Sequence, residues 1–170
     1  MDVKALLNDA YSRIQESVHT AVEGLAPEQL NRQPEAGTNS VTWLVWHLTR
    51  VQDDHISELA GRPQAWAEDG WAARFGLPHA EDATGYGHTA REVAQVTVDD
   101  GALLLDYYDA VHARTLAYLD GLTEDELDRV VDEGWTPPVT LGVRLVSVLG
   151  DDLQHAGQAE FLRGMLARGA

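Results

Sequence analysis

The chain has 170 residues, no cysteine, and 28 acidic against 12 basic residues, which gives a formal net charge of -16. Its length fits one domain, and 44% hydrophobic residues suffice for a core, so intrinsic disorder and a disulfide scaffold are excluded. Because the chain has no basic cluster and no run near the roughly 20 apolar residues of a membrane span, we expect a soluble, cytoplasmic protein with neither nucleic acid nor membrane as a partner.

Apolar residues at helical spacing predict a first long helix over residues 3–24, with Gly24 near its end. The following segment, 25–39, contains two prolines and a glycine and is predicted to be a connector, with one short turn at 27–30. The second long helix is predicted over 41–61. Ser40 is a suitable N-cap for it, Gly61 a suitable end, and Pro63 lies just beyond.

Residues 62–98 form the least regular part of the sequence and are rich in Gly, Pro, Trp and His. A short helix is predicted from Thr89 to Gln95. Long ordered loops placed by a rigid scaffold often carry specificity, so we expect a substrate lid in this insertion. The third long helix is predicted from about Asp100 to Tyr118 by its apolar spacing.

The last part of the chain contains a predicted helical turn and then the fourth long helix. Thr123 and Glu126 have the spacing of a capping box. Pro137 and Pro138 prevent a helix until Thr140, which begins the last helix, extending to residue 168. No strand-like alternation of useful length and no internal repeat occur, so the sequence predicts a single all-α domain over 1–170, a four-helix bundle with an irregular insertion between its second and third long helices.

Ionisable residues occur on two helix faces that are otherwise apolar. In the last helix Asp151, Asp152 and His155 lie on or beside the apolar stripe, and in the second helix His47 and His55 lie near the apolar face. A buried carboxylate without a partner costs several kcal/mol, so these residues need an explanation. Asp151 and His155 are four residues apart and Asp152 and His155 three apart, and either pair could reach one ion.

A histidine from one helix and a carboxylate–histidine pair from another are the usual components of a metal site inside a bundle. The sequence therefore predicts a divalent metal centre between the second and last long helices. The alternative is a set of ordinary core histidines and a local ion pair, which the spacing does not exclude. The other histidines and the tryptophans are interpreted as core, wall, loop or surface residues.

The segments SVTWLVWHLTRVQDDHISELAG and LVSVLGDDLQHAGQAEFLRG resemble the DinB-like superfamily. The shared features are a histidine in a W-x-x-H-L context and a histidine followed by x-G-Q, and the resemblance extends from the first helix to about residue 163. That superfamily includes mycothiol- and bacillithiol-dependent S-transferases and mycothiol-dependent maleylpyruvate isomerase. The resemblance implies a four-helix bundle, often a homodimer, that holds a metal through three side chains, usually all histidine.

Carried to this sequence, the resemblance assigns His47 and His155 as metal ligands. The family ligand four residues before the last histidine corresponds to Asp151, so this chain would have two histidines and one carboxylate. Such a set suits zinc, nickel, iron(II) or manganese. The substitution leaves open whether Asp152 or His55 completes the set instead, or whether metal binding has been lost.

The resemblance implies a metal-dependent thiol S-transferase that uses a low-molecular-weight thiol such as mycothiol against a small electrophile. A metal-dependent hydrolase or isomerase, and a non-catalytic metal-binding or stress-associated protein, remain as alternatives. No catalytic residue is assigned from the sequence. We expect the insertion to shape the electrophile pocket and an arginine to anchor a carboxylate; the candidates are Trp66, Trp71, Phe75 and Tyr86, with Arg50 or Arg144.

Overall fold

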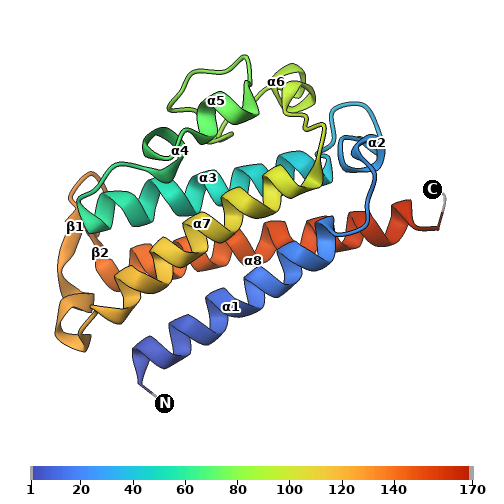
Figure 1. Cartoon of the computed structure of the whole chain (residues 1–170). Coiled ribbons are helices and arrows are strands. Elements are labelled where there is room, and N and C mark those ends of the chain that lie inside the picture. Colours follow the sequence, from blue (N-terminus) through green and yellow to red (C-terminus); the bar gives the residue numbers. More distant parts are fainter. Residues whose placement is uncertain (1, 169–170) are drawn as a thin grey trace.

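The structure is a computed structural model that describes residues 2–168. Four long helices form its framework: α1 (Val3–Val22), α3 (Val41–Ala60), α7 (Gly101–Asp120) and α8 (Leu141–Leu166). Helix α8 packs against α3 and α1, and α7 packs against the same two helices from the other side (Figure 1). The predicted all-α four-helix bundle is confirmed. No helix in the described part of the chain combines the length and apolar character needed to cross a membrane.

Each long helix is preceded by a polar residue that acts as its N-cap. The side chains of Asp2, Ser40, Asp100 and Thr140 each accept a hydrogen bond from a backbone N–H in the first turn of the helix that follows. These N-caps satisfy donors that have no partner within the helix. Helix α3 ends at Gly61 in the left-handed conformation, as its sequence predicts.

The connections contain short helices: α2 (Pro27–Leu30), α4 (Ala65–Glu68), α5 (Trp71–Phe75), α6 (Ala90–Gln95) and the 3-10 helix η1 (Glu124–Asp128). The predictions of α2, α6 and η1 are confirmed, and α6 and η1 each begin with a capping box. Helices α4 and α5 were not predicted, because elements of four or five residues are too short to show helical periodicity.

One small region of the structure contains strands that the sequence did not predict. Strands β1 (Val130–Asp132) and β2 (Val139–Thr140) form an antiparallel pair immediately before α8. Strands of two and three residues carry too little alternation to be predicted. The pair leads the chain from η1 into the first turn of α8, where the backbone N–H of Leu141 donates to the carbonyl of Arg129.

A buried aspartate on α3 holds the insertion against the bundle. The carboxylate of Asp53 is 1% exposed and accepts hydrogen bonds from the backbone N–H groups of Ala65 and Trp66, at 2.9 and 2.8 Å. It also accepts one from the Tyr107 hydroxyl on α7, at 2.9 Å. The Ser57 hydroxyl on α3 donates to it as well, at 3.1 Å. One side chain therefore connects α3, α4 and α7, and its charge is compensated by four donors.

A buried arginine one turn earlier on α3 fixes the later part of the insertion. The guanidinium of Arg50 is fully buried and lies 3.7 Å from the carboxylate of Asp53. It donates to the side-chain oxygen of Gln64 at 2.7 Å and to the backbone carbonyl of Ala83 at 3.1 Å. The segment that passes over α3 at residues 83–85 is therefore attached to the helix through Arg50.

We predict that Asp53→Ala lowers the free energy of unfolding by about 3–5 kcal/mol, because it leaves the buried Arg50 charge and two backbone N–H groups without their acceptor. Urea denaturation followed by circular dichroism measures the change. The matched control is Asp99→Ala, at an exposed aspartate just before α7, where a change below about 0.5 kcal/mol is expected. Similar losses in the two variants would contradict the role given to Asp53.

Candidate metal centre

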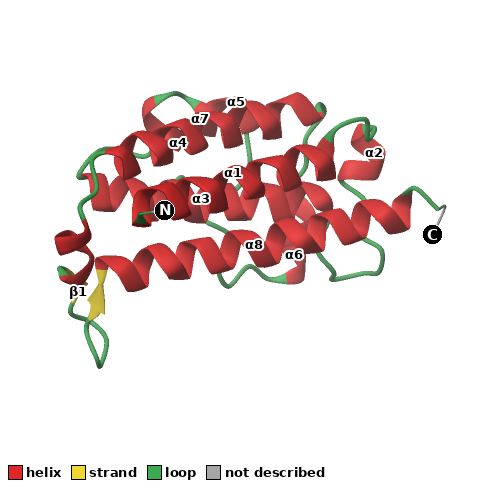
Figure 2. Ribbon diagram, turned by 90° about the horizontal axis from the view of Figure 1, so that it is seen from below, coloured by secondary structure: helices red, strands yellow, loops and turns green. Residues whose placement is uncertain are grey.

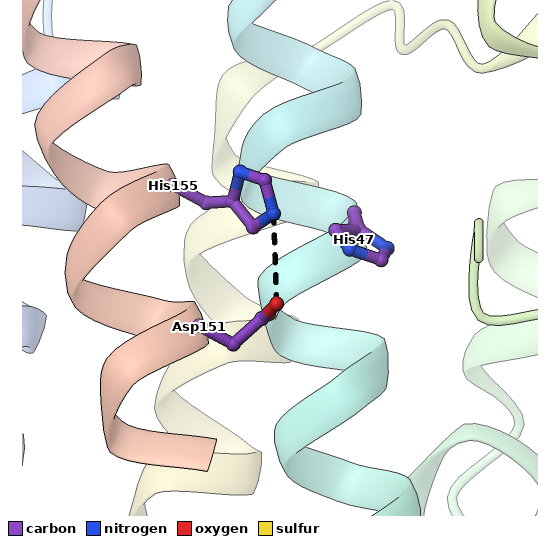
Figure 3. Close-up of side chains that lie close together, drawn as sticks. All are labelled: His47, Asp151 and His155. Atoms are coloured by element: carbon purple, nitrogen blue, oxygen red, sulfur yellow. Dashed lines mark ion pairs between the residues drawn. The ribbon is translucent and has the colours of Figure 1, made fainter. Parts of the chain in front are cut away.

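The structure brings together the three residues that the sequence and the resemblance single out. His47 extends from the middle of α3, and Asp151 and His155 extend from successive turns of α8, all toward the space between the two helices (Figure 3). One ligand atom of each residue lies within 4.8 Å of the others. Nε2 of His155 and Oδ1 of Asp151 are 3.6 Å apart.

The ring of His47 is held in one orientation by the insertion. Its Nδ1 lies 2.6 Å from the backbone carbonyl of Thr84. A carbonyl only accepts, so Nδ1 carries the proton and Nε2 keeps its lone pair. The ring also stacks on Trp43, with centroids 4.6 Å apart. Burial lowers the pKa of His47, so the ring is neutral and able to bind a metal at neutral pH.

His155 has the same arrangement of its two ring nitrogens. Nδ1 donates to the side-chain oxygen of Gln158 at 2.9 Å, one turn further along α8, which leaves Nε2 facing Asp151. The edge of the ring approaches His47, with centroids 4.9 Å apart, and Trp43, at 6.2 Å. Metal-binding histidines in proteins nearly always donate the second ring N–H to such an acceptor.

Asp151 supplies the negative charge of the cluster. Its Oδ2 is buried and has no hydrogen-bond partner in the part of the chain that the structure describes. An unpaired carboxylate oxygen at this depth is costly, and a cation between the helices would remove the cost.

The three side chains fit a divalent transition metal. Two imidazole nitrogens and a carboxylate oxygen are suitable donors for zinc, nickel, iron(II) or manganese. Two ligands of a tetrahedral ion with bonds near 2.1 Å are about 3.4 Å apart, close to the 3.6 Å between His155 and Asp151. Three protein ligands would leave at least one coordination position for a small molecule.

Neither of the two residues that the sequence left as alternatives to Asp151 belongs to the cluster of candidate ligands. Asp152 is fully buried, on a different side of α8 from Asp151. Burial raises its pKa well above the usual range, and the charge of Asp151 adds to this effect. The ring nitrogens of His55 approach Arg144, at 3.2 and 3.5 Å. Burial and the Arg144 charge both lower the pKa of His55.

A pocket of about 380 Å³ opens beside the cluster, and its walls come from α3, α8 and the insertion. Its polar lining consists of His47, Asp54, His55, Thr84, Tyr86, Ser147 and Asp151, with Val51 and Val148 as the apolar part. Two of the three candidate ligands therefore border a space large enough for a small molecule.

The insertion contributes to this pocket differently from the sequence-based expectation. Tyr86 lines the pocket and is 92% exposed. Trp66, Trp71 and Phe75 are instead buried and pack around Tyr107 of α7, so they belong to the core. In a helix, the spacing of apolar residues shows which of them face the core. The insertion is irregular and has no such spacing, so its core and pocket residues could not be distinguished from the sequence.

The expected carboxylate anchor is also placed differently. Arg50 is buried within the network with Asp53 and does not line the pocket. Arg144 donates to Asp132 of β1 at 2.8 Å and contacts His55, which lines the pocket. Of the two arginines, Arg144 is therefore the one at the border of the site.

The residues that orient the ligands were not assigned from the sequence. Thr84 acts through a backbone carbonyl, which side-chain identity does not reveal. Gly85 is required beside it: a Cβ there would lie 2.7 Å from Nδ1 of His47, and its φ is +95°. Gln158 is the glutamine of the x-G-Q pattern after His155, so its position was visible in the sequence although its role was not.

The fold and the site define the class of this protein. It is an all-α bundle in which two histidines and an aspartate from facing helices form a candidate metal centre. The chain is a member of the DinB superfamily, whose sequence profile matches residues 10–159. The crystal structure of a conserved protein from Enterococcus faecalis is similar, with a TM-score of 0.90, 37% sequence identity and 96% of each chain covered. A comparison with the curated proteins found no match.

We predict that Gly85→Ala disturbs the site and that Gly87→Ala does not. Both glycines have positive φ, so an alanine causes backbone strain at either position. The two positions differ in space: a Cβ on Gly87 meets nothing within 4 Å, whereas one on Gly85 collides with His47. Gly85→Ala should cost about 1–3 kcal/mol more of unfolding free energy and shift the His47 ring signals in nitrogen-15 NMR spectra. Equal effects of the two substitutions would disprove the close contact.

Proposed function

We propose that the protein is a metal-dependent thiol S-transferase in which His47, Asp151 and His155 hold the ion. The observation that carries the proposal is the orientation of the two imidazoles: each Nδ1 is engaged by an acceptor, and each Nε2 is left for the space beside the Asp151 carboxylate. Structural ion pairs do not require this matched arrangement, whereas metal sites use it routinely.

When bound, the ion supplies the positive charge that stabilises a thiolate at neutral pH. The chain itself has no cysteine, so the sulfur nucleophile has to come from a small molecule such as mycothiol. In the proposal that molecule binds in the pocket of about 380 Å³ that His47 and Asp151 line. Its sulfur would form the new bond to an electrophilic carbon, and the leaving group would depart with its bonding electrons.

The proton of the thiol needs an acceptor, and His55 is suitably placed. It lines the same pocket, with Nδ1 3.9 Å from the carboxylate of Asp54. Because its pKa is lowered by burial and by Arg144, its ring is neutral near pH 7 and can take up a proton. Trp43 contacts the rings of both His47 and His155, with centroids 4.6 and 6.2 Å away.

The first test is metal binding. The protein purified without chelator should bind about one divalent transition metal per chain, and His155→Ala should weaken the affinity at least about 100-fold, because it removes one of three ligands. Isothermal titration with zinc, nickel and manganese after dialysis measures both quantities. The matched control is His19→Ala on α1, whose ring contacts Asp109 and Glu23, and its affinity should equal that of the original protein. Unchanged affinity in His155→Ala would refute the site.

The second test is thiol conjugation. We expect the metal-loaded protein to accelerate the reaction of a low-molecular-weight thiol with halogenated or epoxide electrophiles, and His47→Ala to remove the acceleration. Chromatography of the products with and without thiol measures this. Turnover of an ester, amide or isomerisable substrate without thiol would show instead that the site activates water, and would contradict the S-transferase proposal while leaving the metal centre intact.

A further inference from the structure

A second pocket lies in the insertion, separate from the pocket of the candidate metal centre. It has a volume of about 220 Å³ and shares no lining residue with the pocket beside His47. Its walls come from α3, α4, α5 and the loop at 76–89, a stretch without helix or strand (Figure 2). Three of its lining residues, Ala73, Ala80 and Glu81, are exposed, so the pocket opens to solvent between α5 and this loop.

Two buried tryptophans form the inner wall of this pocket. Trp46 of α3 and Trp66 of α4 are 1% and 4% exposed, and their rings meet edge to face with centroids 6.2 Å apart. Each ring is also held from another side. His88 stacks on Trp46 at 5.7 Å, and the guanidinium of Arg50 lies 4.7 Å from the centre of the Trp66 ring. Stacking and a cation over an aromatic face both favour one orientation, so the inner wall is rigid.

The polar atoms of this wall lack hydrogen-bond partners. Three buried nitrogens of lining residues have none in the part of the chain that the structure describes: Nε1 of Trp46, Nε1 of Trp66 and Nε2 of His79. Buried tryptophans usually donate this hydrogen, as Trp43 does to His88 at 3.3 Å. A buried donor without an acceptor is destabilising. Two such donors and an imidazole along one pocket indicate that a hydrogen-bond acceptor binds there.

The rest of the lining sets the size and character of a ligand. Ala72, Ala73, Leu77 and Ala80 are apolar, so a ligand would make mainly hydrophobic contacts beyond the inner wall. A cavity of about 150 Å³ holds benzene, so 220 Å³ holds a ring of that size with a substituent of a few atoms. An apolar cleft with a few polar groups at fixed positions is the usual form of a small-molecule site.

The charges around the pocket favour a neutral ligand. Glu81 is the only carboxylate among the lining residues, and no lysine or arginine is among them. An anion would be repelled by Glu81 and by the net charge of -16 of the chain. A cation would meet donors rather than acceptors at the inner wall. A neutral group that accepts from the tryptophans and donates toward Glu81 fits both ends of the pocket, and a carboxamide has these two properties.

From these observations we infer that the pocket binds a small neutral molecule, a ring of about the size of benzene that carries a carboxamide. Its carbonyl oxygen accepts from the indole N–H groups of the inner wall, its ring contacts Ala72 and Leu77, and its NH₂ group faces Glu81. The inference rests on the wall formed by Trp46 and Trp66 and holds whether or not the other pocket binds metal.

Nuclear magnetic resonance tests the pocket, because each of the five tryptophans gives one indole N–H signal. Benzamide is the probe, and benzoate, which has a similar shape and a negative charge, is its control. Benzamide should shift the signals of Trp46 and Trp66 in a saturable way, with a dissociation constant of about 1 mM or below. Benzoate should bind at least about 10-fold more weakly, because Glu81 repels it. Single Trp→Phe variants assign the signals, since each variant lacks one.

The exposed tryptophan serves as the control within the same spectrum. The indole signal of Trp135, whose side chain is 67% exposed, should not move with benzamide. The absence of saturable shifts at Trp46 and Trp66, an equal shift at Trp135, or equal affinity for benzoate would each overturn the inference.

Two tryptophan variants locate the bound probe. Trp66→Phe keeps an aromatic ring and removes one donor, so the affinity for benzamide should fall about 3–10-fold, the effect of one hydrogen bond. The matched control is Trp71→Phe on α5. Trp71 is also buried, with an indole nitrogen that has no partner among the described residues, but it does not line the pocket, so the affinity should stay the same. Circular dichroism confirms that both variants fold, and equal affinities in the two would contradict the assigned pocket.

Discussion

The hydrogen bond from Nδ1 of His47 to the carbonyl of Thr84 is the interaction on which the geometry of the site depends. It selects the ring tautomer that leaves Nε2 toward α8, and it can form only because Gly85 lets the insertion approach α3 closely. The approach is fixed in turn by Arg50, which binds the carbonyl of Ala83, and by Asp53, which binds the start of α4. Two buried charges on α3, one and nearly two turns after His47, thus set the orientation of its ring.

The aspartate at position 151 gives the cluster a different balance of charge from three neutral imidazoles. In the proposed site, one carboxylate would reduce the charge of a divalent ion from +2 to +1, and its oxygen would favour somewhat harder metals than a third nitrogen would. The neighbouring acid, Asp152, lies outside the cluster, and burial raises its pKa well above the usual range. Two adjacent aspartates on one helix therefore have different environments, because one faces the pocket and the other faces the core.

The helices and the candidate ligands were predictable from the sequence because both depend on local patterns. Apolar spacing and N-caps such as Ser40 define the long helices, and residues on facing stripes have to meet when those helices pack. The insertion was less predictable: its contacts to the site pass through a backbone carbonyl at Thr84, and its aromatic residues, such as Trp66, pack in the core. Neither property follows from residue type in a segment without periodicity.

The most direct test of the account is the position of a bound metal in a crystal of the zinc-loaded protein. Anomalous diffraction at the zinc absorption edge should show one strong peak per chain about 2.0–2.2 Å from Nε2 of His47, Nε2 of His155 and a carboxylate oxygen of Asp151. A peak bound by other residues, or none between α3 and α8, would contradict the proposal that these three side chains form a metal centre.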